Sequence, residues 1–328
     1  MNGREKLTIA IPTFNRGEIL KKCLNDLLKL NRSVVEILVV DNHSTDSTEK
    51  VCTELLEKQQ ISYFRNSANV GPGRNIFLCF LYAKSDNIMF IGDDDRLSHD
   101  YVGKVINLIE TEEYSFISYE QGHKIWEIDR FKPTEHSAAL VFMRSGTLGG
   151  NVYNRKLIDL SVLPPTDRAI YPQIATAMNC ALKGRLLIVK GYNIIEVDYY
   201  SSIGISEKSI ERPGDYGIGE RVGYIYNLFQ LGEVSLEVYL SCLNSLLTWT
   251  EYIVDSKMNL NAKNSILFIK QLILIKEISS LRKFFHILVN KFFLNNKISF
   301  LQKLDVFMFF SRNRLSAFIG LQRKNFKA

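Results

Sequence analysis

The chain has 328 residues, enough to bury a substantial core and to form one large domain or two smaller ones. Apolar residues make up 46% and charged residues 23%, which excludes a wholly disordered chain. The net charge of +6 is unevenly distributed, because residues 257–328 hold 14 of the 41 Lys and Arg but only two of the 35 acids. The part before them therefore carries 27 basic and 33 acidic residues, and we expect the basic C-terminal region to have a separate role.

The five cysteines are far apart in the sequence and form no CxxC motif. An odd number of scattered cysteines predicts buried thiols in a reducing compartment, rather than a disulfide or zinc framework. The first fifteen residues lack the apolar segment of a secretory signal, and no uncharged apolar run reaches the roughly 18 residues of a membrane span. These features predict a cytoplasmic protein that is soluble or peripheral to a membrane.

The first hundred residues alternate short apolar runs with helical patterns. The patterns predict strands at 7–12, 34–40, 61–64 and 87–91, and helices at 18–30, after residue 46 or 47, and at 74–83. The run at 34–40 is apolar almost throughout, as expected when both faces of a parallel sheet are covered. We therefore predict an α/β domain with a mainly parallel sheet, right-handed crossovers and helices on both faces.

The later part of the chain is less regular. It predicts a helix at 102–109, strands near 115–119 and 140–142, a Gly-rich turn at 146–150, a helix at 173–182 and a strand at 185–189. The predicted organisation is a nucleotide-binding type of domain over 1–203, a mobile loop over 204–220 and a helical, basic region over 221–328.

Three adjacent aspartates, Asp93, Asp94 and Asp95, follow the apolar strand predicted at 87–91. Carboxylates crowded at the end of a buried strand repel one another and resist desolvation unless a cation neutralises them. Mg²⁺ and Mn²⁺ take oxygen ligands, and a diphosphate can supply the remaining ones. In open α/β sheets, ligands bind beyond the carboxyl ends of the strands, where this triplet falls. A solvated acidic turn or a helix cap is the alternative for so short a motif.

Two further segments follow strands of the same predicted sheet. Asp41 can accept a hydrogen bond from the imide N–H of uracil or thymine, although the residues after it can also serve only to cap a helix. In 69–75, glycines allow close approach to a ligand and Arg74 can pair with phosphate, although Gly-Pro-Gly is commonly just a turn. With residues 12–15 after the first strand, these segments predict a single ligand site.

The segments IPTFNRGEILKKCL, ILVVDNHSTDST, NVGPGRN and FIGDDD, in this order and spacing, resemble family 2 of the glycosyltransferases, whose fold is GT-A. The resemblance covers about residues 5–200 and is most specific up to about residue 100. The NVGPGRN and GDDD variants are most similar to abequosyltransferase-like and other bacterial O-antigen or capsule enzymes.

This resemblance implies a nucleotide-sugar donor and a bound Mn²⁺ or Mg²⁺. It implies that Pro12, Thr13 and Asn15 line the nucleotide pocket and that Asp41 binds the base. Arg74 would lie in the loop that approaches the base and the phosphates. Asp93 would contact the ribose, and Asp94 would support its neighbours. The implied metal ligands are Asp95 and Asp93, and the resemblance implies that the ion held by Asp95 bridges the diphosphate. Family members commonly add a histidine, but none lies between His136 and His286, so a third protein ligand is missing from the pattern.

Inverting transfer needs a carboxylate that removes the proton of the acceptor hydroxyl. The acidic pair that carries this role in the family is absent, and residues 171–173 stand in its place. Asp167 is the nearest carboxylate and the candidate base, with a helix cap or an exposed loop residue as an equal alternative. Gly150 and Asn151 match the acceptor-facing loop of the family, although two adjacent glycines can also form only a turn.

The basic region mixes apolar clusters with Lys and Arg over 266–310. Such helices can lie on an anionic membrane surface, or pack on the catalytic domain with a solvated basic face. The acceptors of the resembling enzymes are undecaprenyl-linked, so a peripheral location on the inner face of the cell membrane is expected. Nucleic acid is not an expected partner, because no recognised motif accompanies the charge.

The predicted function is inverting transfer of a sugar from a UDP- or dTDP/CDP-linked donor to a lipid-linked saccharide in O-antigen or capsule synthesis. A nucleotidyltransferase also combines such a sheet with a carboxylate-bound metal, but TFNRGE is a poor version of its Gly-rich loop. A non-catalytic, membrane-associated adaptor that kept the fold and lost its base is the third possibility.

Overall fold

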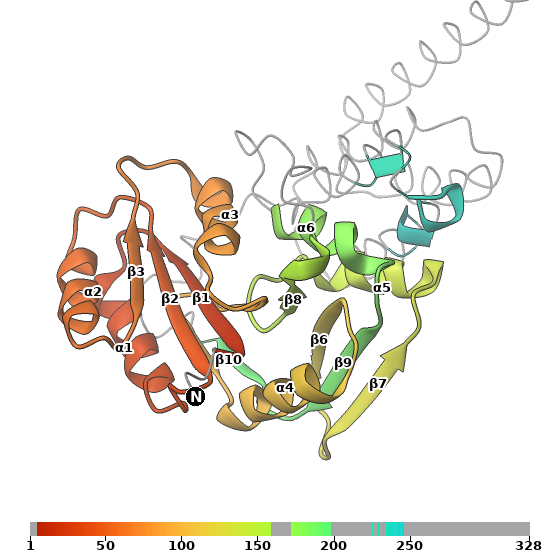
Figure 1. Ribbon diagram of the computed structural model, residues 1–328, viewed down its shortest axis with the longest axis horizontal. Coiled ribbons are helices and arrows are strands. Elements are labelled where there is room, and N and C mark those ends of the chain that lie inside the picture. The colour runs from red at the N-terminus through yellow and green to blue at the C-terminus, as the bar shows by residue number, and fades with distance from the viewer. Residues whose placement is uncertain are drawn as a thin grey trace, which may run out of the picture. The chain divides into compact units, whose positions relative to one another are not determined.

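The structure is a computed structural model that describes residues 5–158 and 172–197, together with isolated positions between 225 and 245. The described residues belong to one compact unit. Its centre is an eight-stranded mixed sheet, in the order β3-β2-β1-β4-β8-β6-β9-β7 (Figure 1). The strands of this sheet are β1 (Leu7–Thr13), β2 (Val35–Asp41), β3 (Ser62–Arg65), β4 (Asn87–Phe90), β6 (Phe116–Gln121), β7 (Glu127–Phe131), β8 (Val152–Asn154) and β9 (Leu186–Gly191).

The four strands β3, β2, β1 and β4 run parallel to one another. Strand β6 pairs parallel with β9, while β8 and β7 run antiparallel to their neighbours. A separate antiparallel pair joins β5 (Asp95–Leu97) to β10 (Ile195–Val197). The carboxyl ends of the four parallel strands therefore lie at the same edge of the sheet. Strand β5 of the separate pair begins at Asp95, the last of the three aspartates.

Helices cover both faces of the sheet. They are α1 (Gly17–Leu27), α2 (Thr48–Glu57), α3 (Pro72–Tyr82), α4 (His99–Thr111), α5 (Glu135–Arg144) and α6 (Pro172–Ala181), with a 3₁₀ turn at η1 (Arg155–Leu157). Apolar residues of α1, α2 and α4 share one core with the strands. On the other face, α3 packs on β1 and β2, and α6 contacts α3 and α5.

An aromatic cluster fills the core beneath α3. The rings of Phe80, Phe90, Phe116 and Tyr153 meet edge to face, with centroids 4.9–5.7 Å apart. Each is fully buried, and burial of one large apolar side chain contributes about 1.5–3 kcal/mol. The cluster therefore joins the parallel strands to β6 and β8 and makes the two halves of the sheet one body.

The α/β sheet with helices on both faces confirms the predicted fold class. The elements predicted up to residue 109 are found close to their predicted limits, as are the helix and strand predicted at 173–182 and 185–189. Helix α2 begins at Thr48 after its N-cap residue Ser47, as predicted for residue 46 or 47. The Asp46 carboxylate just before it accepts hydrogen bonds from the backbone N–H groups of Thr48 (3.0 Å) and Gly17 (2.9 Å). All five cysteines are free and buried, as predicted.

The strand predicted near 140–142 is wrong, because these residues lie within α5. Thr134 and Ser137 form a capping box, in which each hydroxyl accepts a hydrogen bond from the backbone N–H of the other, at 3.3 and 2.9 Å. The helix that begins there buries Ala138, Val141 and Phe142 on one face. A short apolar run can be a strand or one face of a helix, and here the cap decides between them.

Strands β5, β7, β8 and β10 were not predicted. Strands β5, β8 and β10 are three residues long, and β7 is a largely polar edge strand. The predicted loop at 204–220 and most of the region at 221–328 lie outside the described residues, so that part of the domain organisation stays a prediction. Within the described part of the chain, no helix has the length and apolarity that crossing a membrane requires.

Gly17 lies where α1 begins against the start of α2. A Cβ at this position would lie 2.4 Å from Ser47 Oγ and 2.6 Å from the backbone nitrogen of Thr48. We expect Gly17→Ala to lower the free energy of unfolding by about 1–3 kcal/mol, because the two backbones must move apart. In α4, a Cβ on Gly103 would meet no atom within 4 Å, so Gly103→Ala should be neutral or stabilising by less than about 1 kcal/mol. Urea unfolding followed by circular dichroism measures both, and equal effects would contradict the close-contact explanation.

Candidate active site

The candidate site lies at the carboxyl ends of β1, β2 and β4. Thr13 is in register with Asp41, and Ala10 is in register with Phe90. The loops that follow these three strands therefore start at the same edge of the sheet. This places residues 12–15, 41–46 and 92–95 around one region.

Asp93 is held by two neighbours from the loop after β1. The Thr13 hydroxyl donates a hydrogen bond to Asp93 Oδ2 (2.7 Å), and Arg16 Nη1 donates to Asp93 Oδ1 (2.8 Å). The same nitrogen of Arg16 also donates to Asp94 Oδ2 (2.9 Å). Burial raises the pKa of Asp93, and the charge on Arg16 opposes that rise. Thr13 was predicted as a site residue, whereas Arg16 was not. Its positive charge, directly after the predicted site residues 12–15, is the signal that could have identified it.

Asp95 has a different environment from the other two aspartates. It makes no ion pair with any residue that the structure describes, and its carboxylate accepts the backbone N–H of Gly92. Burial, and then the charge on Asp94, raise the pKa of Asp95 to about 6. Asp95 is thus a partly buried carboxylate without a counter-ion.

Two glycines form a cradle beside the Asp95 carboxylate. A Cβ on Gly92 would lie 2.8 Å from Asp95 Oδ2, and one on Gly149 would lie 3.1 Å from the same oxygen. Any side chain at these positions would crowd this oxygen. Because the acid comes from the loop after β4 and Gly149 precedes β8, the tertiary structure brings the two segments together.

The donor set at Asp95 fits the divalent ion that the family resemblance implies. A carboxylate oxygen is a ligand that Mn²⁺ and Mg²⁺ accept, and among the described side chains no cation pairs with Asp95. Among the residues described, no three His, Cys, Asp or Glu side chains are placed to hold a metal by themselves. An ion at Asp95 would therefore take further oxygens from a phosphate or from water. Both oxygens of Asp93 already accept hydrogen bonds, so its role as a second ligand stays a prediction.

Asp41 is fully buried, and its carboxylate is used within the protein. Oδ1 accepts a hydrogen bond from the backbone N–H of Ser44 (2.9 Å), and Oδ2 accepts one from the Tyr63 hydroxyl (2.9 Å). Arg65 Nε lies 3.5 Å from the same Oδ2. A base could contact this carboxylate only by sharing one of these oxygens, so base binding by Asp41 stays a prediction.

The rim of the site is formed by residues just after β1. Asn15 has a left-handed backbone (φ 53°), and its Oδ1 accepts a hydrogen bond from the Thr45 N–H (2.7 Å). This bond joins the loop after β1 to the loop after β2. Pro12 is half-buried beside it, whereas Phe14 is 42% exposed. Phe14 was not predicted as a site residue, and an exposed aromatic ring between two polar residues is the signal that could have identified it.

Asparagine amides fix the loop before α3. Asn42 donates to Asn69 Oδ1 (2.8 Å) and accepts from the Val70 N–H (2.8 Å), which ties this loop to the end of β2. Asn75, in the first turn of α3, donates to the carbonyl of Val40 (2.9 Å). Arg74 is exposed in the same turn, at the edge that carries the three aspartates.

The predicted acceptor residues lie in the turn before β8. Gly150 has a left-handed backbone (φ 82°), and its carbonyl accepts a hydrogen bond from the Tyr101 hydroxyl (2.7 Å). The Asn151 side chain is fully buried and bonds to Ser118 and Thr147. A sugar could reach that amide only if one of these bonds were released, so the acceptor role of Asn151 stays a prediction. The candidate base, Asp167, lies outside the described residues.

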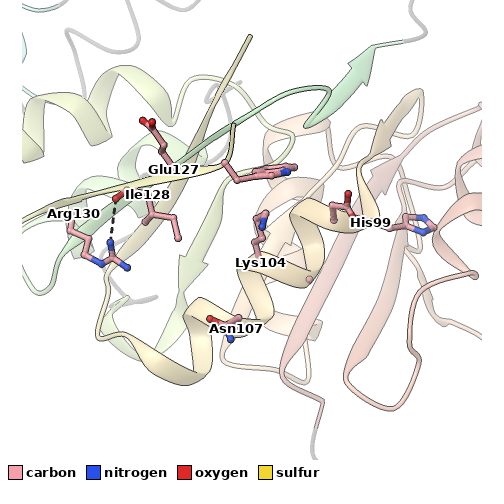
Figure 2. A pocket seen from close by; sticks show the side chains of 9 residues that line it. His99, Lys104, Asn107, Glu127, Ile128 and Arg130 are labelled. Carbon is pink, nitrogen blue, oxygen red and sulfur yellow. Dashed lines mark hydrogen bonds between the residues drawn. The ribbon is translucent and has the colours of Figure 1, made fainter. Parts of the chain in front are cut away.

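A hollow of about 740 Å³ lies between α4 and β7, apart from the candidate site. Figure 2 shows His99, Lys104 and Asn107 on its α4 side and Glu127, Ile128 and Arg130 on its β7 side. The Lys104 Nζ atom lies 4.9 Å from the centroid of the Trp126 ring, and a Cβ on Gly191 would overlap the same ring. Its lining mixes both signs of charge and includes none of the predicted site residues, so the edge of the sheet is the better candidate.

The raised pKa of Asp95 predicts a pH-dependent stability. Because the folded pKa of about 6 exceeds the ~3.9 of an unfolded aspartate, the contribution of this group is fully present below about pH 4 and is lost as the pH rises through about 6. With a chelator present at pH 7.5, we expect Asp95→Asn to be more stable than the wild type by about 1 kcal/mol, after allowance for the partial exposure of the carboxylate.

The difference in stability between Asp95→Asn and the wild type should become smaller toward pH 4. Thermal unfolding between pH 4 and 7.5 can measure this difference. Asp129→Asn serves as the control, because it removes a half-exposed carboxylate on β7 that pairs with Lys190 (2.8 Å). This control should not stabilise the protein at pH 7.5. A stability difference between Asp95→Asn and the wild type that stays constant with pH would contradict the raised pKa of Asp95.

Residues 8–168 match the family model described as glycosyl transferase family 2. A segment of 99 residues is 37% identical to abequosyltransferase RfbV of Salmonella typhimurium, over 29% of each chain. Another of 94 residues is 33% identical to the GalNAc(5)-diNAcBac-PP-undecaprenol beta-1,3-glucosyltransferase of Campylobacter jejuni, over 28% of this chain and 30% of that protein. The matched segments thus span less than a third of the length of these relatives.

Solved structures share the fold over most of the chain. S. aureus TarS 1-349 in complex with UDP-GlcNAc aligns with a TM-score of 0.57 at 17% identity, covering 95% of this chain and 92% of that one. The mannosyltransferase PcManGT from Pyrobaculum calidifontis, in complex with GDP-Man and Mn²⁺, aligns with a TM-score of 0.52 at 12% identity, covering 87% and 84%. Residues 8–168, about half of the chain, therefore match family 2 of the glycosyltransferases, and the fold is GT-A.

Proposed function

We propose that this protein transfers a sugar, with inversion, from a UDP- or dTDP/CDP-linked donor to a lipid-linked saccharide. One observation carries the proposal. Asp93, held by Thr13 and Arg16, and Asp95, which has no counter-ion among the described residues, lie together at the carboxyl edge of the parallel strands. An anionic donor with its cation would neutralise the remaining charge at this edge.

The residues around this edge suit the parts of a nucleotide diphosphate. The exposed ring of Phe14 can stack on a base, a contact worth about 1–3 kcal/mol in other nucleotide-binding proteins. Arg74, in the first turn of α3, adds positive charge where the helix dipole favours phosphate. TarS was solved in complex with UDP-GlcNAc and PcManGT in complex with GDP-Man, which supports a nucleotide-sugar donor.

We propose Mn²⁺ or Mg²⁺ as the cofactor, with Asp95 as its protein ligand. When bound, the ion would stabilise the negative charge of the departing nucleotide diphosphate. Asp93 and Thr13 would orient the donor beside it, because their mutual hydrogen bond fixes both side chains. The Mn²⁺ named for the PcManGT structure supports this choice.

The acceptor side of the proposal depends on the relatives and on charge. The name of the Campylobacter relative describes a transferase for an undecaprenol-linked saccharide. The excess of positive charge over residues 257–328 suits contact with an anionic membrane surface. We therefore propose a peripheral location at the inner face of the cell membrane and a role in surface polysaccharide synthesis, such as O-antigen or capsule.

A second candidate function is a non-catalytic adaptor that keeps the donor site. Helix α6 begins at Pro172, and its first turn contains no acidic residue, where the family resemblance leads us to expect the catalytic acidic pair. The nucleotidyltransferase alternative loses its support, because residues 8–168 match the glycosyltransferase family 2 model. Catalytic turnover separates the remaining two functions.

The donor site can be tested by thermal unfolding with UDP-, dTDP-, CDP- and GDP-sugars, each with and without Mn²⁺. We expect at least one UDP, dTDP or CDP donor to raise the melting temperature by several degrees in the presence of Mn²⁺. Asp95→Ala should lose this metal-dependent rise, whereas Asp129→Ala should retain it. A rise of equal size in Asp95→Ala would contradict the assignment of Asp95 to the metal.

The base can be tested with Asp167→Asn in an assay of donor turnover. If Asp167 removes the acceptor proton, the variant should bind the donor normally and transfer sugar about 10²–10⁴-fold more slowly. Asp159→Asn, which changes a carboxylate earlier in the same segment, provides the control. Turnover near that of the wild type would exclude Asp167, and absence of donor turnover in the wild type would favour the adaptor.

A further inference from the structure

Arg16 is an internal cation between two of the three aspartates. One atom, Nη1, lies 2.8 Å from Asp93 Oδ1 and 2.9 Å from Asp94 Oδ2. The three carboxylates that follow β4 thus have a single cation among the described side chains, and it contacts only the first two. Asp95 is the carboxylate of the three that this cation does not contact, and the charge of Arg16 acts on it only from a distance.

The position of Arg16 is fixed by the fold as well as by charge. Its carbonyl accepts hydrogen bonds from the N–H groups of Ile19 (3.1 Å) and Leu20 (2.9 Å), so its backbone forms the start of α1. Its own N–H donates to the Thr48 hydroxyl (3.3 Å) at the start of α2. These hydrogen bonds fix the Arg16 backbone at the starts of α1 and α2. The side chain therefore extends from a fixed position toward the aspartates.

We propose that Arg16 is a positioning residue that makes metal binding depend on the nucleotide. By occupying Asp93 and Asp94, it prevents the three carboxylates from holding a divalent ion by themselves and leaves Asp95 as the available carboxylate of the three. A single carboxylate holds Mn²⁺ or Mg²⁺ weakly, so the diphosphate must supply further oxygens. The inference rests on the proposed function, because it assumes that the ion and the diphosphate meet at Asp95.

The positive charge of Arg16 also makes metal binding depend on the nucleotide. A guanidinium within several ångströms of a divalent ion lowers the affinity for that ion, and a bound diphosphate offsets the repulsion with its own negative charge. By linkage, the factor by which the nucleotide strengthens metal binding equals the factor by which the metal strengthens nucleotide binding. Arg16 therefore increases the coupling between the two ligands.

The test measures Mn²⁺ binding to the full chain from the electron paramagnetic resonance signal of free Mn²⁺, with and without UDP. Arg16→Gln removes the charge and keeps an amide that can donate to one carboxylate. We expect it to bind Mn²⁺ alone about three- to tenfold more tightly than the wild type, and the strengthening by UDP should fall by a similar factor. Arg16→Met, a second uncharged variant, should behave in the same way.

Two variants control for charge and shape. Arg16→Lys keeps the positive charge and should stay within about twofold of the wild type without UDP. Lys58→Gln removes an equal, exposed charge just after the end of α2, away from the edge that carries the aspartates, and should leave Mn²⁺ binding unchanged. Circular dichroism without Mn²⁺ establishes that each variant is folded.

The outcomes separate this inference from the proposed function. If the wild type binds Mn²⁺ in a UDP-dependent way and folded Arg16→Gln binds Mn²⁺ alone no more tightly, the role of Arg16 is overturned and the proposed site stands. If the wild type binds no Mn²⁺ with or without UDP, both are overturned. Loss of the folded state in both uncharged variants would also overturn the inference, because the cation would then be needed for folding.

Discussion

The mutual repulsion of three carboxylates at the end of a buried strand is the constraint on which the rest of the site depends. Two of them are compensated within the protein, since Arg16 lies between Asp93 and Asp94 and the Thr13 hydroxyl donates to Asp93. The third, Asp95, is partly buried and has a raised pKa. The fold thus tolerates an electrostatic cost at one position, as expected where a charged ligand completes the structure.

The parallel half of the sheet determines where this charge is placed. Strands β1, β2 and β4 are covered on both faces by helices, and the polar side chains of the candidate site lie at or just beyond their carboxyl ends. Those loops are joined by side-chain contacts, such as those of Asn15 with the loop after β2 and of Asn42 with the loop before α3. A buried core and a hydrogen-bonded set of loops thus position the candidate site residues relative to one another.

The fold class and the family resemblance were evident from the sequence alone, and the sequence also predicted that the candidate site residues share one edge of the sheet. Parallel strands that are buried on both faces give nearly continuous apolar runs, and motifs that directly follow such runs must lie at one edge of the sheet. The roles of individual side chains were harder to predict, because they depend on which partners burial provides. Asp41 and Asn151 match family positions in the sequence, but in the structure both are buried and bonded to protein groups.

Only the tertiary structure decided which aspartate lacks a counter-ion and which distant residues surround it. The charge of Arg16 is evident in the sequence, but its contact with residues 77 and 78 positions later requires β1 and β4 to be neighbours. Likewise, Gly149 matters because the fold brings it beside Asp95. Local sequence patterns determine strands, helices and the ends of strands through short-range propensity and burial. Electrostatic compensation depends on long-range contacts, and these exist only once the chain has folded.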